Sequence, residues 1–213
     1  MFSAHFITRL HHRLTALWHA EPGAYPTQAD PFLAIVACQH RANFDLWHIE
    51  DEARRPGATD TQIAAVKRAI DPTNQVRNDL AEQLDESLLQ HLAALDLPNS
   101  DAPLHSETPG LIIDRLSILA LKIYHTGEEA ERTDAPAGHA DRNRSRLAVL
   151  EEQRADLTAC LQCLWDETLA GTRRFKLYRQ LKMYNDPSLN PAIYRMRAQA
   201  KSPEEYPPSG GPS

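Results

Sequence analysis

The stretch of sequence that is most informative about the architecture of this chain is Thr108-Pro-Gly-Leu-Ile-Ile-Asp-Arg-Leu-Ser-Ile-Leu-Ala-Leu-Lys-Ile-Tyr-His125. A threonine followed by a proline is a helix start signal, because the hydroxyl caps free amides and proline needs no amide hydrogen at that position. The helix that follows is apolar nearly all round, which predicts a central place in a bundle. It still carries Asp114, Arg115, Lys122 and His125. Burying ionised groups costs several kcal/mol each unless they are paired, so neighbouring helices should supply partners.

The rest of the chain has the same helical character. Apolar residues recur with the 3.6-residue period in almost every segment, and no segment shows sustained alternation. The sequence therefore predicts an all-α single-domain bundle of five or six helices with a buried polar cluster. The expected helices cover residues 3–19, 30–54, 59–95 with a kink or break at Pro72, 108–127, 141–170 and 172–184, and a short last helix begins at Asn190.

We expect one domain, since a chain of 213 residues is long enough for a single core and rarely forms more than one or two domains. Residues 1–200 make up this helical domain, and residues 1–20 are predicted to form a peripheral amphipathic helix. Residues 201–213 are rich in proline, glycine and serine, a composition that predicts a disordered tail.

Polar side chains also fall on the apolar stripes of the other helices. Asn43 and Glu50 share the stripe of the second helix, Arg77 interrupts that of the third, and Arg154 lies on the buried side of the fifth. Such groups either lock the core through ion pairs or build a polar pocket. The candidate binding residues are Asn43, Trp47, His48, Glu50, Asp51, Arg77, Asp114, Arg115, Lys122, His125, Arg154 and Lys182.

Composition excludes several classes of function. The net charge of −6 argues against nonspecific nucleic-acid binding, and no apolar run approaches the ~20 residues that a membrane span needs. The N-terminal segment lacks the continuous apolar core of a signal peptide. Three cysteines cannot all pair, which indicates a reducing, cytoplasmic location. We expect Cys160 and Cys163 to be small core residues rather than a redox pair.

A metal site is the main alternative to a structural polar cluster. Asp45 and His48 are three residues apart, a spacing that lets two side chains share a metal ion. Glu82 and Asp85 match half of the carboxylate pattern of all-helical nucleotide pyrophosphohydrolases, which hold magnesium between helices. An enzyme of this kind would use Glu50, Asp51, Glu82 and Asp85, together with His48 or Asp114.

Four stretches carry a resemblance to a known group of proteins. They are Asn43-Phe-Asp-Leu-Trp-His-Ile-Glu-Asp-Glu-Ala-Arg54, Lys67-Arg-Ala-Ile-Asp-Pro-Thr-Asn-Gln-Val-Arg-Asn-Asp79, Glu107-Thr-Pro-Gly-Leu-Ile-Ile-Asp-Arg-Leu-Ser-Ile-Leu119 and Lys182-Met-Tyr-Asn-Asp-Pro187. Together they resemble an uncharacterised bacterial domain family of about this length. The resemblance implies a helical, cytoplasmic protein and a loose association with gene clusters for cell-surface glycan assembly. It supplies no reaction and no catalytic residues.

Two classes of function follow. The first is a binding or accessory protein in surface-polysaccharide synthesis that recognises a phosphorylated or nucleotide-linked sugar and needs no cofactor. The second is a phosphohydrolase of nucleotides or sugar phosphates that depends on Mg²⁺ or Mn²⁺. The sequence predicts no specific nucleic-acid partner and leaves a homodimer open.

Overall fold

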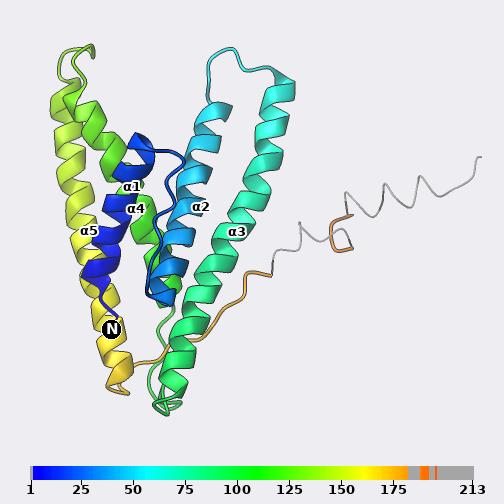
Figure 1. Cartoon of the computed structure of the whole chain (residues 1–213), viewed down its shortest axis with the longest axis vertical. Coiled ribbons are helices and arrows are strands. Elements are labelled where there is room, and N and C mark those ends of the chain that lie inside the picture. The colour runs from blue at the N-terminus through cyan, green and yellow to red at the C-terminus, as the bar shows by residue number, and fades with distance from the viewer. Residues whose placement is uncertain (1, 182–187, 192–194, 196–213) are drawn as a thin grey trace, which may run out of the picture. The chain divides into compact units, whose positions relative to one another are not determined.

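The computed structural model describes residues 2–181, 188–191 and 195. Within these residues the chain forms five long helices and no strand, which confirms the predicted all-α bundle (Figure 1). The helices are α1 (Ala4–Ala20), α2 (Pro31–Ala53), α3 (Asp60–Ala93), α4 (Pro109–Glu131) and α5 (His139–Leu169). No helix among these residues is both long enough and apolar enough to span a bilayer.

Three helices begin where the sequence places a cap. The carboxylate of Asp30 accepts the amide hydrogens of Phe32 and Leu33 at the start of α2. Thr59 forms a reciprocal capping box with Gln62 at the start of α3. The Thr108 hydroxyl accepts the Leu111 amide at the start of α4. Each cap satisfies amides that have no partner inside the helix.

Helix α4 is the centre of the bundle, as its apolar sequence predicts. It contacts each of the other four helices. Ile112, Ile113 and Leu116 are almost completely buried, and they pack in a core cluster with Leu14 of α1 and Leu161 of α5. This burial removes large apolar side chains from water, at roughly 1.5–3 kcal/mol for each such side chain.

The N-terminal helix contributes to the same core. We expected residues 1–20 to form a peripheral amphipathic helix. Helix α1 is amphipathic, and its apolar face, with Ile7, Leu10, Leu14 and Trp18, is buried against the bundle.

Two helix boundaries differ from the expected ones. Helix α3 continues through Pro72 as one helix, where Pro72 is exposed and water can reach the carbonyl that loses its partner. Helix α4 continues past Gly127 to Glu131, so the expected loop at residues 126–140 is shorter. Gly127 lies inside the helix and does not end it. A glycine ends a helix only where its backbone adopts the left-handed αL conformation.

The predicted helix at residues 172–184 is wrong over its described part. Residues 172–181 contain no helix. Arg174 instead exchanges backbone hydrogen bonds with the 98–107 loop, accepting from His105 at 2.7 Å and donating to Pro103 at 3.1 Å. Phe175 is 1% exposed and packs with Leu92 and Trp165 in a second core cluster. These tertiary contacts outweigh the helical periodicity of the segment.

The chain divides into two compact units, Met1–Tyr178 and Arg179–Ser213. The expected domain end at residue 200, the tail at 201–213 and the candidate residue Lys182 lie outside the described residues. The expectation of core cysteines is wrong, because Cys38, Cys160 and Cys163 are all exposed and free.

Candidate functional site

Asp114 is the focus of the buried polar cluster. It is 6% exposed and accepts hydrogen bonds from Gln39 Nε2 at 2.5 Å and from Asn43 Nδ2 at 2.9 Å. Arg77 of α3 donates from Nη2 to Oδ2 at 3.0 Å, and its Nε lies 3.0 Å from Oδ1. The carboxylate therefore joins α2, α3 and α4, and its charged partner, Arg77, comes from a neighbouring helix.

The cluster continues from Asn43 into α1. Asn43 Nδ2 donates to Ser117 Oγ at 2.9 Å, and Ser117 Oγ is 2.7 Å from His40 Nδ1. His40 Nε2 is 2.9 Å from Thr15 Oγ1, which itself donates to the His11 carbonyl at 3.0 Å. Because the only Thr15 hydroxyl proton is used on that carbonyl, His40 must donate from Nε2 and accept at Nδ1.

This proton arrangement requires a neutral His40. Burial, and then the neighbouring His11, hold the pKa of His40 well below its usual value. Burial alone lowers the pKa of His11 to about 3. Both rings therefore stay neutral at physiological pH. The network is a chain of hydrogen-bonded dipoles around one ion pair, and within the described residues Gln39 Oε1 and both His11 ring nitrogens are buried without a hydrogen-bond partner. Such a network fixes which helix faces meet.

A cavity of about 360 Å³ lies beside this network, between α2, α3 and α4. Its wall combines one indole ring, two guanidinium groups, two carboxylates and an amide with aliphatic side chains. Five of the residues proposed from the sequence line it: Asn43, Trp47, Glu50, Asp51 and Arg77. The remaining lining residues are Leu46, Arg54, Ile118 and Leu121. Glu50 and Arg54 form an exposed ion pair at 2.8 Å.

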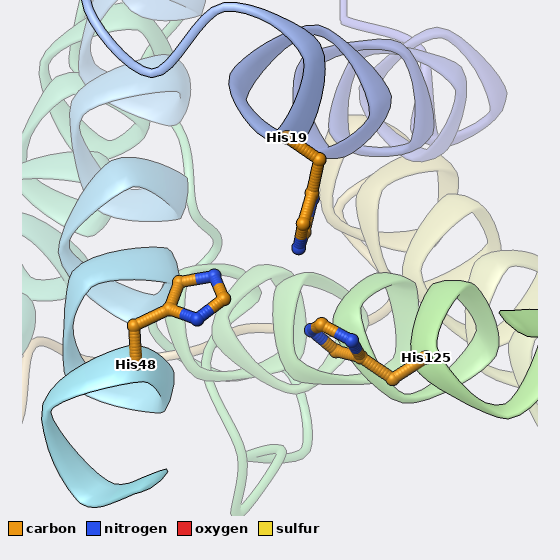
Figure 2. Close-up of side chains that lie close together, drawn as sticks. All are labelled: His19, His48 and His125. Atoms are coloured by element: carbon orange, nitrogen blue, oxygen red, sulfur yellow. The ribbon is translucent and has the colours of Figure 1, made fainter. Parts of the chain in front are cut away.

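The other proposed site residues separate into two groups. His48 and His125 meet His19 at the C-terminal end of α1, and these three imidazoles form the one group that could hold a metal ion among the described residues (Figure 2). Arg115 pairs with Glu107 at 2.9 Å, and it lines a different depression together with the exposed Lys122. Arg154 is half-buried on α5 and lines none of these cavities.

The carboxylates expected to share Mg²⁺ or Mn²⁺ do not converge. Glu50 pairs with Arg54, and Asp114 pairs with Arg77. Asp85 is 3% exposed and accepts the Gly110 amide at 2.7 Å, so it caps the start of α4. Asp45, which was considered together with His48, forms an ion pair with Arg41 at 2.8 Å.

Several residues of the cluster were not singled out from the sequence. Gln39 and His40 precede Asn43 on the buried face of α2 at helical spacing, so the periodicity that exposed Asn43 could also have found them. Ser117 lies three residues after Asp114 and shares its face of α4 in the same way. No local pattern identifies His19, because its partners come from two other helices.

The bundle with its buried ion pair and adjoining cavity defines an all-helical protein with one internal polar centre. Residues 33–177 match the family model of a protein of unknown function, DUF4254, and the chain belongs to this family. Comparison with curated proteins and with solved structures finds no match for the chain. The description of the family names no reaction, ligand or site residue.

Proposed function

We propose that the cavity beside Trp47 binds a phosphorylated or nucleotide-linked sugar. The observation that supports this proposal is the composition of the cavity wall, which places guanidinium groups, carboxylates and an amide around one aromatic ring. Its volume of about 360 Å³ falls within the ~300–1,000 Å³ that is usual for small-molecule sites.

Two guanidinium groups could hold the phosphate. Arg77 donates a hydrogen bond to Asp114 from Nη2, while its Nε lies 3.0 Å from the same carboxylate without forming a hydrogen bond, so its Nη1 donors remain for a ligand. Arg54 is bound to Glu50, but this pair is exposed, with side chains 67% and 42% accessible. Exposed pairs contribute only about 0–1 kcal/mol. A phosphate group can therefore displace Glu50 from Arg54 at little cost and gain charge-assisted hydrogen bonds.

The remaining lining groups suit the sugar. Trp47 presents a flat apolar surface, while Asn43 Oδ1, Asp51 and the displaced Glu50 offer oxygen acceptors for hydroxyl groups. The adjoining network holds Asn43 and Arg77 in place before any ligand arrives, which lowers the ordering cost of binding. Recognition rather than hydrolysis is favoured, because the carboxylates of a magnesium-dependent hydrolase do not meet here. Resemblance to proteins of surface-glycan gene clusters supports an accessory role in polysaccharide synthesis.

Calorimetric titration with glucose 1-phosphate, UDP-glucose, UMP and glucose tests this proposal. We expect binding of the phosphorylated sugars and no detectable binding of free glucose. Arg54→Gln should weaken binding about 10-fold or more, since a hydrogen bond to a charged group contributes about 1.5–3 kcal/mol. Arg55→Gln is the matched control, because Arg55 is equally exposed but pairs with Glu52 outside the cavity. Equal affinity in both variants, or no binding of any probe, would refute the proposal.

A further inference from the structure

Three histidines from three helices meet beside the cavity. His19 comes from the last turn of α1, His48 from α2 and His125 from α4. Each offers one ring nitrogen, and these nitrogens all lie within 4.8 Å of one another. Figure 2 shows the rings directed toward a common space between the helices.

Hydrogen bonds fix which nitrogen faces that space. His19 Nδ1 is 2.7 Å from the Thr15 carbonyl, and a carbonyl oxygen only accepts, so Nδ1 carries a proton. His125 Nδ1 lies 2.9 Å from a carboxylate oxygen of Glu128 and is a donor for the same reason. In the neutral rings, both Nε2 atoms then present a lone pair. Both are buried and have no hydrogen-bond partner within the described residues.

Aromatic neighbours hold the rings in place. Tyr124 stacks on His19 at 4.1 Å, and Trp47 stacks on His125 at 5.0 Å with the rings 8° from parallel. The Phe44 ring meets His48 edge-on at 4.5 Å. These contacts restrict ring rotation and shield the inner nitrogens from water. Burying an acceptor without a partner is unfavourable, so the arrangement is destabilising unless something binds these nitrogens.

We propose that His19, His48 and His125 bind one divalent transition-metal ion of the zinc class. Imidazole nitrogens suit zinc, copper, nickel and iron, whereas Mg²⁺ and Ca²⁺ prefer oxygen ligands. Three protein ligands leave a fourth position open for water or a ligand oxygen, as in catalytic rather than structural zinc sites. The protonated Nδ1 atoms, held by a backbone carbonyl and a carboxylate, are the outer hydrogen bonds that metal-binding histidines usually make.

The site has to contract slightly around the ion. Tetrahedral coordination at ~2.1 Å places ligand nitrogens about 3.4 Å apart, whereas the present separations reach 4.8 Å. His48 is the ring most able to move, because its side chain is 40% exposed and its nearest charged group, Asp51, is 4.0 Å away. A rotation of this side chain toward the two buried nitrogens completes the site.

A competition titration with a chromophoric zinc chelator tests this proposal on the untagged full-length chain. Cys160→Ser and Cys163→Ser are introduced first, because these exposed thiols could bind zinc elsewhere. We expect one equivalent of Zn²⁺ per chain. His48→Ala should weaken it at least about 100-fold, more than the loss of an outer hydrogen bond does. His12→Ala, an exposed histidine on α1, is the control and should bind as the parent does.

Cobalt provides a second readout, and circular dichroism separates loss of the metal site from loss of the fold. Co²⁺ bound to the parent protein should give the visible absorption bands of a four-coordinate site, and His48→Ala should lose them while its circular dichroism stays unchanged. The proposal is overturned if the parent binds no zinc, or if His48→Ala binds zinc as tightly as His12→Ala. The metal alone is the probe, so neither outcome bears on the sugar proposal.

Discussion

Nδ1 of His125 lies 2.9 Å from Oε2 of Glu128, one turn further along α4. This contact selects the tautomer of His125 and turns Nε2 toward His19 and His48. Glu128→Ala should therefore weaken zinc binding about 10–100-fold, the usual effect of removing an outer partner of a metal ligand. The chelator competition measures this change. Glu131→Ala, exposed on the same helix, serves as the control. Unchanged affinity in Glu128→Ala would show that Glu128 does not position His125.

The buried pair of Asp114 and Arg77 should dominate the energetics of the cluster. Asp114→Ala leaves three donors from two helices without their acceptor, one of them charged. Breaking a buried pair in this way costs about 3–5 kcal/mol. The free energy of unfolding in urea measures the loss. Glu107→Ala removes the half-buried partner of the exposed Arg115 and should cost about 1 kcal/mol or less. Equal losses would mean that the pair is effectively hydrated.

Asp85 should make the free energy of unfolding decrease as the pH rises. Burial raises its pKa to about 6 from 3.8, although hydrogen bonds from Thr108 and the Gly110 amide oppose this shift. The folded state therefore holds the proton more tightly than the unfolded state does. The stability that this proton supplies is complete below pH 3.8 and is lost as the pH rises through about 6.

Asp85→Asn tests this dependence, because its amide oxygen can still accept from Gly110 while the side chain no longer titrates. Between pH 4 and 7, the free energy of unfolding of the parent should fall relative to that of the variant by up to about 3 kcal/mol. Chemical unfolding at a series of pH values measures both. Parallel pH profiles would contradict a raised pKa at Asp85.

Gly110 lets α3 and α4 approach closely. A Cβ at this position would lie 2.3 Å from the Ala81 carbonyl oxygen and 2.9 Å from the Asp85 carboxyl group. Because backbone has to move, we expect Gly110→Ala to destabilise the fold by about 1–3 kcal/mol or more. Gly127→Ala in the same helix meets nothing within 4 Å and should instead stabilise by about 0.5–1 kcal/mol. Thermal unfolding compares the two, and equal effects would contradict the close packing.

The fold was largely predictable because its signals are local. Asp30, Thr59 and Thr108 cap the helices that they were expected to begin, and the apolar sequence around Ile112 placed α4 at the centre. The sequence-based predictions failed where tertiary contacts determine the local structure. Arg174 pairs with a loop some 70 positions earlier in the chain, and such pairing leaves no mark on helical periodicity.

The site was predictable only in part, for the same reason. Polar residues on an apolar stripe were expected to find partners on neighbouring helices, and the structure joins Arg77 with Asp114. Which imidazoles meet depends on where separate helices cross. His48 was therefore assigned a carboxylate neighbour on its own helix, whereas the structure places it beside His19 and His125. Residue spacing along one helix cannot reveal a group of side chains that come from three different helices.

The indole N–H resonances of the chain test the sugar-binding proposal most directly. The chain has three tryptophans, Trp18, Trp47 and Trp165, and only Trp47 lines the cavity. Titration of the ¹⁵N-labelled protein with glucose 1-phosphate should shift the Trp47 resonance, assigned with Trp47→Phe. Trp18, whose indole donates to the Ala24 carbonyl at 3.0 Å, should stay in place. If Trp47 does not shift at any ligand concentration, or if all three resonances shift together, the cavity is not the binding site.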